Sequence, residues 1–527
     1  MVGWKQVLLY MNIPSKRSKR TQTCLSQFFE RDMELENEVV EEMERELEEM
    51  RECYRSGRTR EASWRKSQLN GLLQLLRERE EEIFRALHQD LGKHPVEAYR
   101  DEIGSLIKSV NYALDGLLRW MSGNKAKLPR IALLSTAEIV PEPLGLVLII
   151  SSWNFPIGLS LEPLIGALAA GNAVVLKPSE LAPECSSLLA NAIPRYLDYK
   201  AVKVIQGGPG TGERLLHWKW DKIFFTGSAR IGRRVLAAAA EHLTPVTLEL
   251  GGKCPAVIDT LSSSFDRKVA VQRVLGAKFT FSAGQVCIGV DYVLVEKKFS
   301  STLVELMKVE MKKMLGENPR ESRTVSRIVN KHHFLRLQSL LLDPLVKSSI
   351  VHGGLMDEEN LFIEPTILMD PPLQAAIMKD EIFGPLLPIV TLNKIEDSIE
   401  FINSRPKPLA IYVFTKDESL GRSMVSKTSS GSVVFNDTII QYLADALPFG
   451  GIGESGMGKY HGKFSFDTFS HNKAVLRRSF LVDFWFRFPP WNDDKLQLFR
   501  SSYCYDYLGI VLTVLGLKRT NGVSKRD

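Results

Sequence analysis

Short apolar runs alternate with helical segments between residues 145 and 250, and this repetition limits the fold more than any other feature. The runs carry Val, Ile and Leu at consecutive positions, as strands do when both faces of their sheet are buried. Such strands, each followed by a helix, are typical of a parallel sheet that helices cover on both sides. The pattern therefore predicts an α/β fold with a doubly wound, Rossmann-type sheet that binds a nucleotide. The expected strands cover 145–151, 173–179, 202–208 and 222–228, and the expected helices cover 160–170, 183–197 and 230–242.

A second α/β block is expected from 251 to about 443, because further short apolar runs follow the first set. A chain of 527 residues is too long for one hydrophobic core, so we expect several domains that pack against each other. Upstream, residues 34–55, 61–90 and 95–122 show the periodicity of amphipathic helices. Residues 131–145 alternate in the manner of a hairpin. The strands expected in the second block cover 255–259, 291–297, 385–392, 409–415 and 431–437.

Composition argues against several classes of protein. An apolar content of 44% and a charged content of 25% are typical of a compact soluble protein. The formal charge of +6 is small, and much of it lies near the two ends, so nucleic-acid binding is not expected. The six cysteines form no CxxC pair and have no nearby histidines, which argues against a metal site and a disulfide framework. A reducing compartment is the natural interpretation.

The amino-terminal extension, residues 1–32, has no acidic residue before Glu30 and contains several basic ones. This composition loosely resembles that of an organelle transit peptide, and a disordered extension without a targeting role is an equal alternative. We expect a cytoplasmic protein, with a plastid or the surface of the endoplasmic reticulum as alternatives.

The carboxyl-terminal extension contains an apolar segment at 507–517. A spanning helix needs about 20 apolar residues, and Asp506 directly precedes this segment, so it is too short to cross a bilayer. We expect the segment to pack against the protein. The alternative is a peripheral membrane contact assisted by Lys518 and Arg519.

Three residues meet separate requirements of one acyl-transfer reaction. Cys287 lies in a loop with Gly and Gln, which predicts an accessible, partly ionised thiol that attacks an aldehyde carbon. The amide of Asn154 and the backbone N–H of Cys287 are candidate donors to the oxyanion, although Asn154 also suits a simple turn. Glu249 ends an apolar strand before two glycines, so we expect a raised pKa and a role as base. A paired structural carboxylate is the alternative for Glu249.

Two expected strand ends carry residues suited to a dinucleotide. Lys177 closes one strand and Glu180 follows it, at the edge of the sheet where nucleotides bind, so both are candidates for ribose hydroxyls. A surface ion pair is the alternative. Gly227, Ser228 and Gly232 open a helix directly after another strand, and a helix amino terminus receives phosphate through free N–H groups. The spacing is neither a P-loop nor the common GxGxxG pattern.

Two downstream segments complete the predicted site. In DEIFGP, Glu381 offers a carboxylate for the nicotinamide ribose and Phe383 offers an aromatic wall. The glycine-rich loop at 448–458 is suited to line a pocket. Either segment alone could be a turn, and their occurrence together with the earlier motifs carries the argument.

Taken in order, these motifs resemble the NAD(P)-dependent aldehyde dehydrogenase family over roughly residues 33 to 480. The resemblance rests on SSWNFP, LKPSE, FFTGS, VTLELGGK, GQVCIG, DEIFGP and PFGGIGESGMG. FDTFSH and the lengthened tail are similar to the class 3, fatty-aldehyde-like branch, and HLTPVTLELGGKCP with NKHH is similar to its plant members. The resemblance implies oxidation of medium- or long-chain aldehydes to carboxylic acids with NAD, or with NADP, by a homodimer.

The resemblance also implies site residues and domains. It gives catalytic roles to Asn154, Glu249 and Cys287, and cofactor roles to Trp153, Lys177, Glu180, Gly227, Ser228, Gly232, Glu381 and Phe383. It implies a cofactor domain at 33–125 and 145–250, a catalytic domain at 251–443, oligomerisation elements at 126–144 and 444–480, and terminal extensions at 1–32 and 481–527.

Two positions depart from the family pattern. Ser282 stands where the family commonly has Asn, and Val290 stands where it often has Pro, which puts the geometry of the Cys287 loop in question. One competing reading is a dehydrogenase that passes the acyl group to coenzyme A, but such relatives lack the carboxylate that Glu249 supplies. The other is a weakly active member that serves as a binding or structural protein, which the presence of Cys287 argues against.

Overall fold

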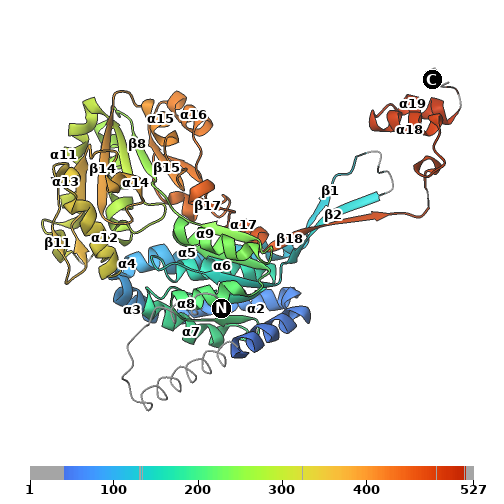
Figure 1. Cartoon of the computed structure of the whole chain (residues 1–527), viewed down its shortest axis with the longest axis horizontal. Coiled ribbons are helices and arrows are strands. Elements are labelled where there is room, and N and C mark those ends of the chain that lie inside the picture. Colours follow the sequence, from blue (N-terminus) through green and yellow to red (C-terminus); the bar gives the residue numbers. More distant parts are fainter. Residues whose placement is uncertain are drawn as a thin grey trace, which may run out of the picture.

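The computed structural model describes residues 41–129, 132, 135–322, 324–481, 483–515 and 517. The expected extension at 1–32 therefore lies outside the described residues. Figure 1 shows two α/β bodies, each built on its own sheet, and a slender arm of strands that leads to a small helical unit near the carboxyl end.

The first sheet confirms the doubly wound architecture expected from the sequence. Its strand order is β17-β7-β6-β3-β4-β5, and β3 to β7 run parallel. The order reverses between β3 and β6, which makes the carboxyl edge near these strands a topological switch point. The strands are β3 (Leu146–Ile150), β4 (Ala173–Lys177), β5 (Val202–Val204), β6 (Lys222–Thr226), β7 (Val246–Glu249) and β17 (Gly456–Met457).

Helices cover this sheet. Some of them precede it in the chain, and others alternate with its strands. Helix α6 is buried at every position from Gly158 to Ala170, and Gly171 ends it at a φ of 91°. Pro183 begins α7 at a position where its missing N–H costs no hydrogen bond. The other helices of this body are a helix over 41–55, α2 (Ala62–Glu78), α3 (Glu80–Leu91), α4 (Pro95–Ala98), the π-helical turn η2 (Tyr99–Ile103), α5 (Gly104–Met121), α7 (Pro183–Tyr196), α8 (Pro209–His217) and α9 (Ala229–Ala240).

The second sheet has the order β10-β13-β14-β9-β8-β15-β16, and only β10 is antiparallel to its neighbour. The five strands expected here are present, and β10 and β13 add to them at one side. The strands are β8 (Pro255–Ile258), β9 (Tyr292–Glu296), β10 (Ile350–His352), β13 (Thr366–Met369), β14 (Leu386–Leu392), β15 (Ala410–Phe414) and β16 (Ser432–Phe435), with a small pair β11 (Met356–Asp357) and β12 (Phe362–Ile363). Its helices are α10 (Ser264–Leu275), α11 (Lys297–Leu315), α12 (Lys331–Leu342), α13 (Pro344–Lys347), α14 (Ala376–Lys379), α15 (Asp397–Asn403) and α16 (Glu418–Lys427).

The strands of the arm show that the hairpin prediction is wrong. Residues 131–145 do not form both strands of a hairpin: their described part forms the single strand β2 (Ser135–Pro143). It pairs on one side with β1 (Asn124–Ala126) and on the other with β18 (Ser470–Arg478), which follows α17 (Lys463–Thr468). The partners lie before and far after β2 in the chain, so local alternation could not reveal the pairing.

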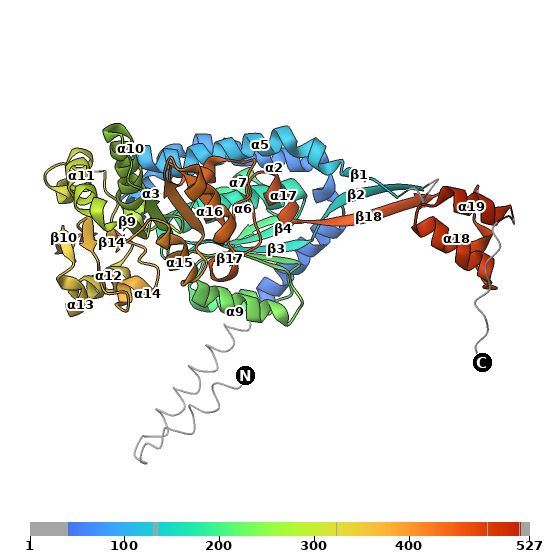
Figure 2. The ribbon, with the colours of Figure 1, turned by 90° about the horizontal axis from the view of Figure 1, so that it is seen from above.

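The carboxyl-terminal unit makes another expectation more specific. The helix expected to pack against the protein, α19 (Tyr507–Val514), packs on α18 (Asp493–Tyr503) of its own extension, at the far end of β18. Both views place these helices away from the two α/β bodies (Figures 1 and 2). Within the described residues, no helix has both the length and the apolar character needed to cross a bilayer.

Candidate active site

The three predicted catalytic residues come together between the two sheets. Asn154 follows β3 and Glu249 ends β7, so both lie at the carboxyl edge of the first sheet. Cys287 lies in the loop before β9, at the amino edge of the second sheet. The Asn154 amide donates to the carbonyl of Gln285 at 2.9 Å, and the carboxyl of Glu249 interacts with the Cys287 thiol.

An apolar cavity of about 270 Å³ ends on Cys287. Aromatic and aliphatic side chains form most of its wall, and the charged pair Arg100 and Asp101 also borders it. Such a cavity excludes water and favours apolar ligands. The sequence predicted a lining role only for the loop at 448–458. Most of the wall comes from other segments: η2, the turn before α6, α6 itself, the Cys287 loop and residues 438–443. The apolar lining residues are Phe155, Leu159, Phe281, Val286, Ile288, Ile439, Ile440, Tyr442, Leu443, Phe449 and Tyr460.

The environment of Glu249 gives it the character of a base near neutrality. Its side chain is buried, and burial raises its pKa to about 7, as the sequence predicted. The thiol of Cys287 interacts with the carboxyl and offsets part of this rise. Within the described residues, neither carboxyl oxygen has a hydrogen-bond partner of ordinary geometry. The described residues therefore provide no hydrogen-bond partner that would support Glu249 as a paired structural carboxylate.

The predicted ionisation of Cys287 is wrong for this state. Burial raises the pKa of the thiol well above its usual value, and the negative charge of nearby Glu249 raises it further. A loop position favours accessibility, but it does not by itself provide the positive charge that would stabilise a thiolate. The thiol is therefore neutral in this structure.

Asn154 is buried, and one hydrogen of its amide is used by Gln285. An Asn amide carries two N–H donors, so the second is left for an oxyanion. Gln285 itself is tied in place: its side chain donates to the carbonyls of Ser282 and Arg327 and accepts from the N–H of Val329. Sequence analysis missed Gln285, and its position two residues before Cys287 was the available signal.

The loop before Cys287 has an unusual backbone. Ser282, Ala283 and Gly284 have φ angles of 45°, 49° and 78°, a left-handed region that non-glycine residues rarely adopt. Ser282, which departs from the family pattern, is the first of them, and Val290 is fully buried. The turn is held by contacts from outside the loop, since two of its residues have no intrinsic preference for this conformation.

Five predicted cofactor residues share one edge of the first sheet. Lys177 ends β4 and forms an ion pair of 3.0 Å with Glu180, whose side chain is 36% exposed. Ser228 caps α9 by accepting from the N–H of Ile231, directly after Gly227. The neighbouring helical N–H groups at this terminus have no intrahelical partners, which suits a phosphate. Gly232 lets α9 approach closely, because a Cβ there would lie 3.0 Å from the Leu250 side chain.

Trp153 follows β3 at this same edge, and Glu381 and Phe383 lie in the loop before β14. The rings of Trp153 and Phe383 meet edge to face at 5.3 Å. The carboxyl of Glu381 lies against the two glycines after Glu249, where a Cβ on Gly251 would lie 2.6 Å from its oxygen. Burial raises the pKa of Glu381 to about 8. Among the described residues, one of its oxygens has no hydrogen-bond partner, which leaves it open to a ligand hydroxyl.

The glycine-rich loop at 448–458 has two functions in this fold. Phe449 contributes to the cavity wall, as predicted for a loop that lines a pocket. The end of the loop forms β17, which pairs Gly456 with Glu249 and so fixes the backbone of the predicted base. Its glycines allow close backbone approach: a Cβ on Gly451 would lie 2.1 Å from the carbonyl oxygen of Ser455.

A thiol that faces a carboxyl base, beside the switch point of a nucleotide-binding sheet, defines a class of enzyme. These are dehydrogenases that oxidise a substrate while sulfur holds it. A family model described as "Aldehyde dehydrogenase family" matches residues 31–475. The chain belongs to this family and is an aldehyde dehydrogenase.

Individual relatives show the branch of the family to which this chain is similar. Aldehyde dehydrogenase family 3 member F1 of Arabidopsis thaliana is 54% identical, with 92% of this chain and 100% of that protein covered. Family 3 member I1, chloroplastic, from the same plant is 48% identical, with 90% and 86% covered. A solved structure described as the substrate bound state of Staphylococcus aureus AldH has a TM-score of 0.84 at 38% identity, with 88% of this chain and 99% of that one covered. The resemblance to plant members of the class 3 branch is confirmed.

Proposed function

We propose that this aldehyde dehydrogenase oxidises medium- to long-chain or other apolar aldehydes to carboxylic acids with NAD(P). The observation that carries the substrate class is the cavity of about 270 Å³ that ends on Cys287, because its wall is almost wholly apolar. An apolar chain gains free energy by leaving water for such a wall, whereas a short or charged aldehyde gains little.

In the proposed reaction the sulfur of Cys287 attacks the carbonyl carbon, and the thiol proton passes to Glu249. The second N–H of Asn154 and the backbone N–H of Cys287 donate to the oxyanion of the resulting thiohemiacetal. NAD(P), when bound, would accept a hydride from the former aldehyde carbon, and the acyl group would then remain on Cys287 as a thioester. After Glu249 has released its proton, it takes one from water, which attacks the thioester carbon. The carbon–sulfur bond then breaks, the acid is freed, and the proton returns to the sulfur of Cys287.

The residues at the first sheet fit this cofactor. The helix terminus at Ser228 suits the pyrophosphate, and Lys177 with Glu180 suits ribose hydroxyls. Glu381, with its unpartnered oxygen, suits the nicotinamide ribose. A carboxylate at Glu180 repels a 2′-phosphate, so we propose that NAD is preferred and NADP is also accepted.

The experiment that tests the proposal is a steady-state series of straight-chain aldehydes with each cofactor. We expect kcat/KM to rise by up to about four-fold for each added methylene until the cavity is filled, since burying a methylene is worth about 0.8 kcal/mol. The measurement is NADH or NADPH absorbance. A flat series would contradict the apolar substrate class, and inactivity at every chain length would favour a binding or structural role.

We propose that two copies of the chain associate through the arm. In the sheet β1-β2-β18, the nine-residue strand β18 pairs with β2 on one side, and within the described residues no strand covers its other side. An open strand edge favours pairing with another chain. A homodimer joined here is also what the family resemblance implies.

We further propose that the carboxyl-terminal unit makes a peripheral contact with a membrane. Large apolar side chains are exposed over its surface, including Trp485, Trp491 and Leu508, the last at 70%. In the sequence, Lys518 and Arg519 follow the apolar segment at 507–517, and a segment that combines apolar and basic residues favours the interface of anionic lipids. For location, the cytoplasm stays the proposal, with the reticulum surface or a plastid as alternatives.

Vesicles test the membrane contact. We expect the full chain to sediment with anionic phospholipid vesicles, and the doubly substituted Leu508→Asp, Val511→Asp chain to lose at least about ten-fold in partitioning. Both residues are exposed in α19, so their replacement leaves the fold and the aldehyde activity unchanged. A matched variant, Leu335→Asp, places a charge on an exposed apolar site of α12 and should partition like the original chain. Equal partitioning of all three proteins would contradict the contact.

A further inference from the structure

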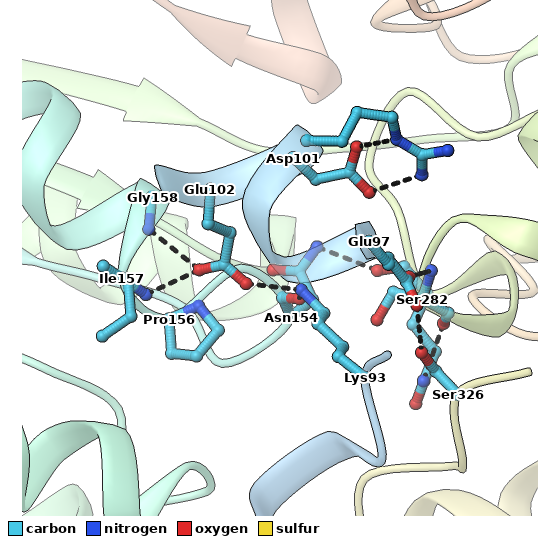
Figure 3. A network of polar contacts seen from close by, with 12 residues as sticks. Lys93, Glu97, Asp101, Glu102, Asn154, Pro156, Ile157, Gly158, Ser282 and Ser326 are labelled. Carbon is cyan, nitrogen blue, oxygen red and sulfur yellow. Dashed lines mark hydrogen bonds and ion pairs between the residues drawn. The ribbon is translucent and has the colours of Figure 1, made fainter. Parts of the chain in front are cut away.

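A network of buried charged residues lies behind the catalytic residues, and no step of the proposed reaction uses it. Its members are Lys93, Glu97 and Glu102, from the segment between α3 and α5 (Figure 3). Lys93 and Glu102 are fully buried, and Glu97 is nearly so. A buried charge is costly unless it is paired, so each of these side chains must have specific partners.

Lys93 holds the backbone of the predicted oxyanion donor. Its ammonium forms an ion pair of 2.6 Å with Glu102 and donates to the carbonyl of Asn154 at 2.8 Å. It also lies 4.0 Å from the centre of the Phe155 ring, a favourable cation–π contact. The hydrogen bond and the cation–π contact hold Asn154 and Phe155, and the ion pair holds Lys93 in position to make them.

Glu102 holds the other end of the same turn. One of its oxygens accepts from the N–H groups of Ile157 and Gly158, at 2.9 and 3.0 Å, at the start of α6. A carboxylate is stabilised there by the helix dipole and by otherwise unpaired N–H groups. The turn from Asn154 to Gly158 is thus clamped at its first residue by Lys93 and at its last by Glu102.

Glu97 reaches the loop that carries the nucleophile. It accepts from the N–H of Ser282 at 2.6 Å and from the hydroxyl of Ser326 at 2.8 Å. Ser282 is the first of the three left-handed residues, so Glu97 supports the turn where its backbone is least favourable. Asn154 then joins the two halves through Gln285, whose carbonyl accepts from the amide.

We propose that Lys93, Glu97 and Glu102 are positioning residues that align the Asn154 amide with the sulfur of Cys287. The proposal rests on the catalytic roles proposed above for those two residues. Buried ion pairs contribute little net stability compared with apolar side chains of the same size, but they fix geometry. A displacement of about 1 Å in a catalytic group costs about 100-fold in rate, so such fixing matters to catalysis.

The first test compares two carboxylates that cap helices. Glu102→Gln removes the charge that clamps α6, and Asp90→Asn removes a matched charge, since buried Asp90 accepts from the N–H groups of Glu184 and Cys185 at the start of α7. Both variants should lose thermal stability. Only Glu102→Gln should lower the rate constant of the first-turnover NADH burst, by at least about ten-fold at saturating aldehyde and NAD.

The second test asks how much the acceptor oxygens of Glu97 contribute to holding the loop that carries Cys287. Glu97→Gln keeps the shape and one acceptor oxygen for Ser282, whereas Glu97→Leu keeps neither acceptor. We expect the burst rate to stay within about three-fold for Glu97→Gln and to fall by more than about ten-fold for Glu97→Leu, with the Kd for NAD unchanged in both. Alkylation of Cys287 by iodoacetamide, measured by mass spectrometry, should change in the same order.

The outcomes separate this inference from the proposed function. If Glu102→Gln and Glu97→Leu lose stability but keep the burst rate of Asp90→Asn, the network is only structural and the inference is overturned. If the unsubstituted enzyme gives no burst, or if Cys287→Ala keeps one, the proposed function itself fails. Measuring all rates well below the lowest melting temperature keeps loss of folding out of the comparison.

Discussion

Replacement of Cys287 by Ala is expected to lower aldehyde oxidation by about 10⁴-fold or more, since Cys287 is the only thiol among the described residues that line the cavity. Cys287 is the thiol that ends the apolar cavity and faces Glu249. Binding of NAD should be unchanged, because the proposed cofactor contacts lie on the first sheet and around Glu381. The measurements are NADH absorbance for the reaction and fluorescence quenching for the cofactor.

The matched control for this variant is Cys504→Ala. Cys504 is an exposed cysteine at the end of α18, in the unit that lies away from the two α/β bodies (Figure 2), so its loss should leave activity intact. Substantial activity in Cys287→Ala would rule out sulfur as the nucleophile. Activity lost in both variants would point to a general effect of thiol removal on the fold.

The second large effect is expected from Glu249→Gln, which should trap the acyl-enzyme. The variant still has the Cys287 thiol, but it lacks the base that activates water for the thioester. We expect kcat to fall by about 10²- to 10⁴-fold, the usual range for a general base. Intact-mass spectrometry should then show an adduct of the acyl group on the protein during turnover of a slow substrate.

The pH dependence of this step has a defined sign. The pKa of Glu249 is about 7, and the base must be deprotonated, so hydrolysis should rise as pH increases through about 7. In the Glu249→Gln variant, this rise of the hydrolysis rate with pH should be absent. The matched control is Glu162→Gln, since burial also raises the pKa of Glu162 to about 7 and it has no part in the reaction. If Glu162→Gln removes the rise of the rate with pH and Glu249→Gln keeps it, Glu249 is not the base.

Much of the fold could be predicted because strand patterns are local. The runs that became β3, β4 and β6 contain three or more consecutive apolar residues, and this property depends only on neighbouring residues and on burial of both faces. Strand β2 could not be understood in the same way. Its partner β18 lies more than 300 residues later, so its pairing is a property of the assembled chain.

The candidate site, too, could be predicted only in part. The residue types of Cys287, Glu249 and Asn154 suggested a reaction, and the structure brings all three to one place. The ionisation state of Cys287 could not be predicted, since a pKa depends on solvent exclusion and on charges brought near by folding. The same holds for the apolar cavity, whose wall is assembled from distant segments.

The sequence by itself determined which residue types are available for the proposed chemistry, because a thiol, a carboxylate and an amide keep their reactivity types in any fold. It also determined the parallel strands, because apolar runs are local. Only the tertiary structure decided how these groups act. It placed a neutral thiol beside a buried carboxyl, and it joined Lys93, Glu97 and Glu102 to the catalytic loops. The physical reason is that burial and electrostatic coupling act through space, between residues far apart along the chain.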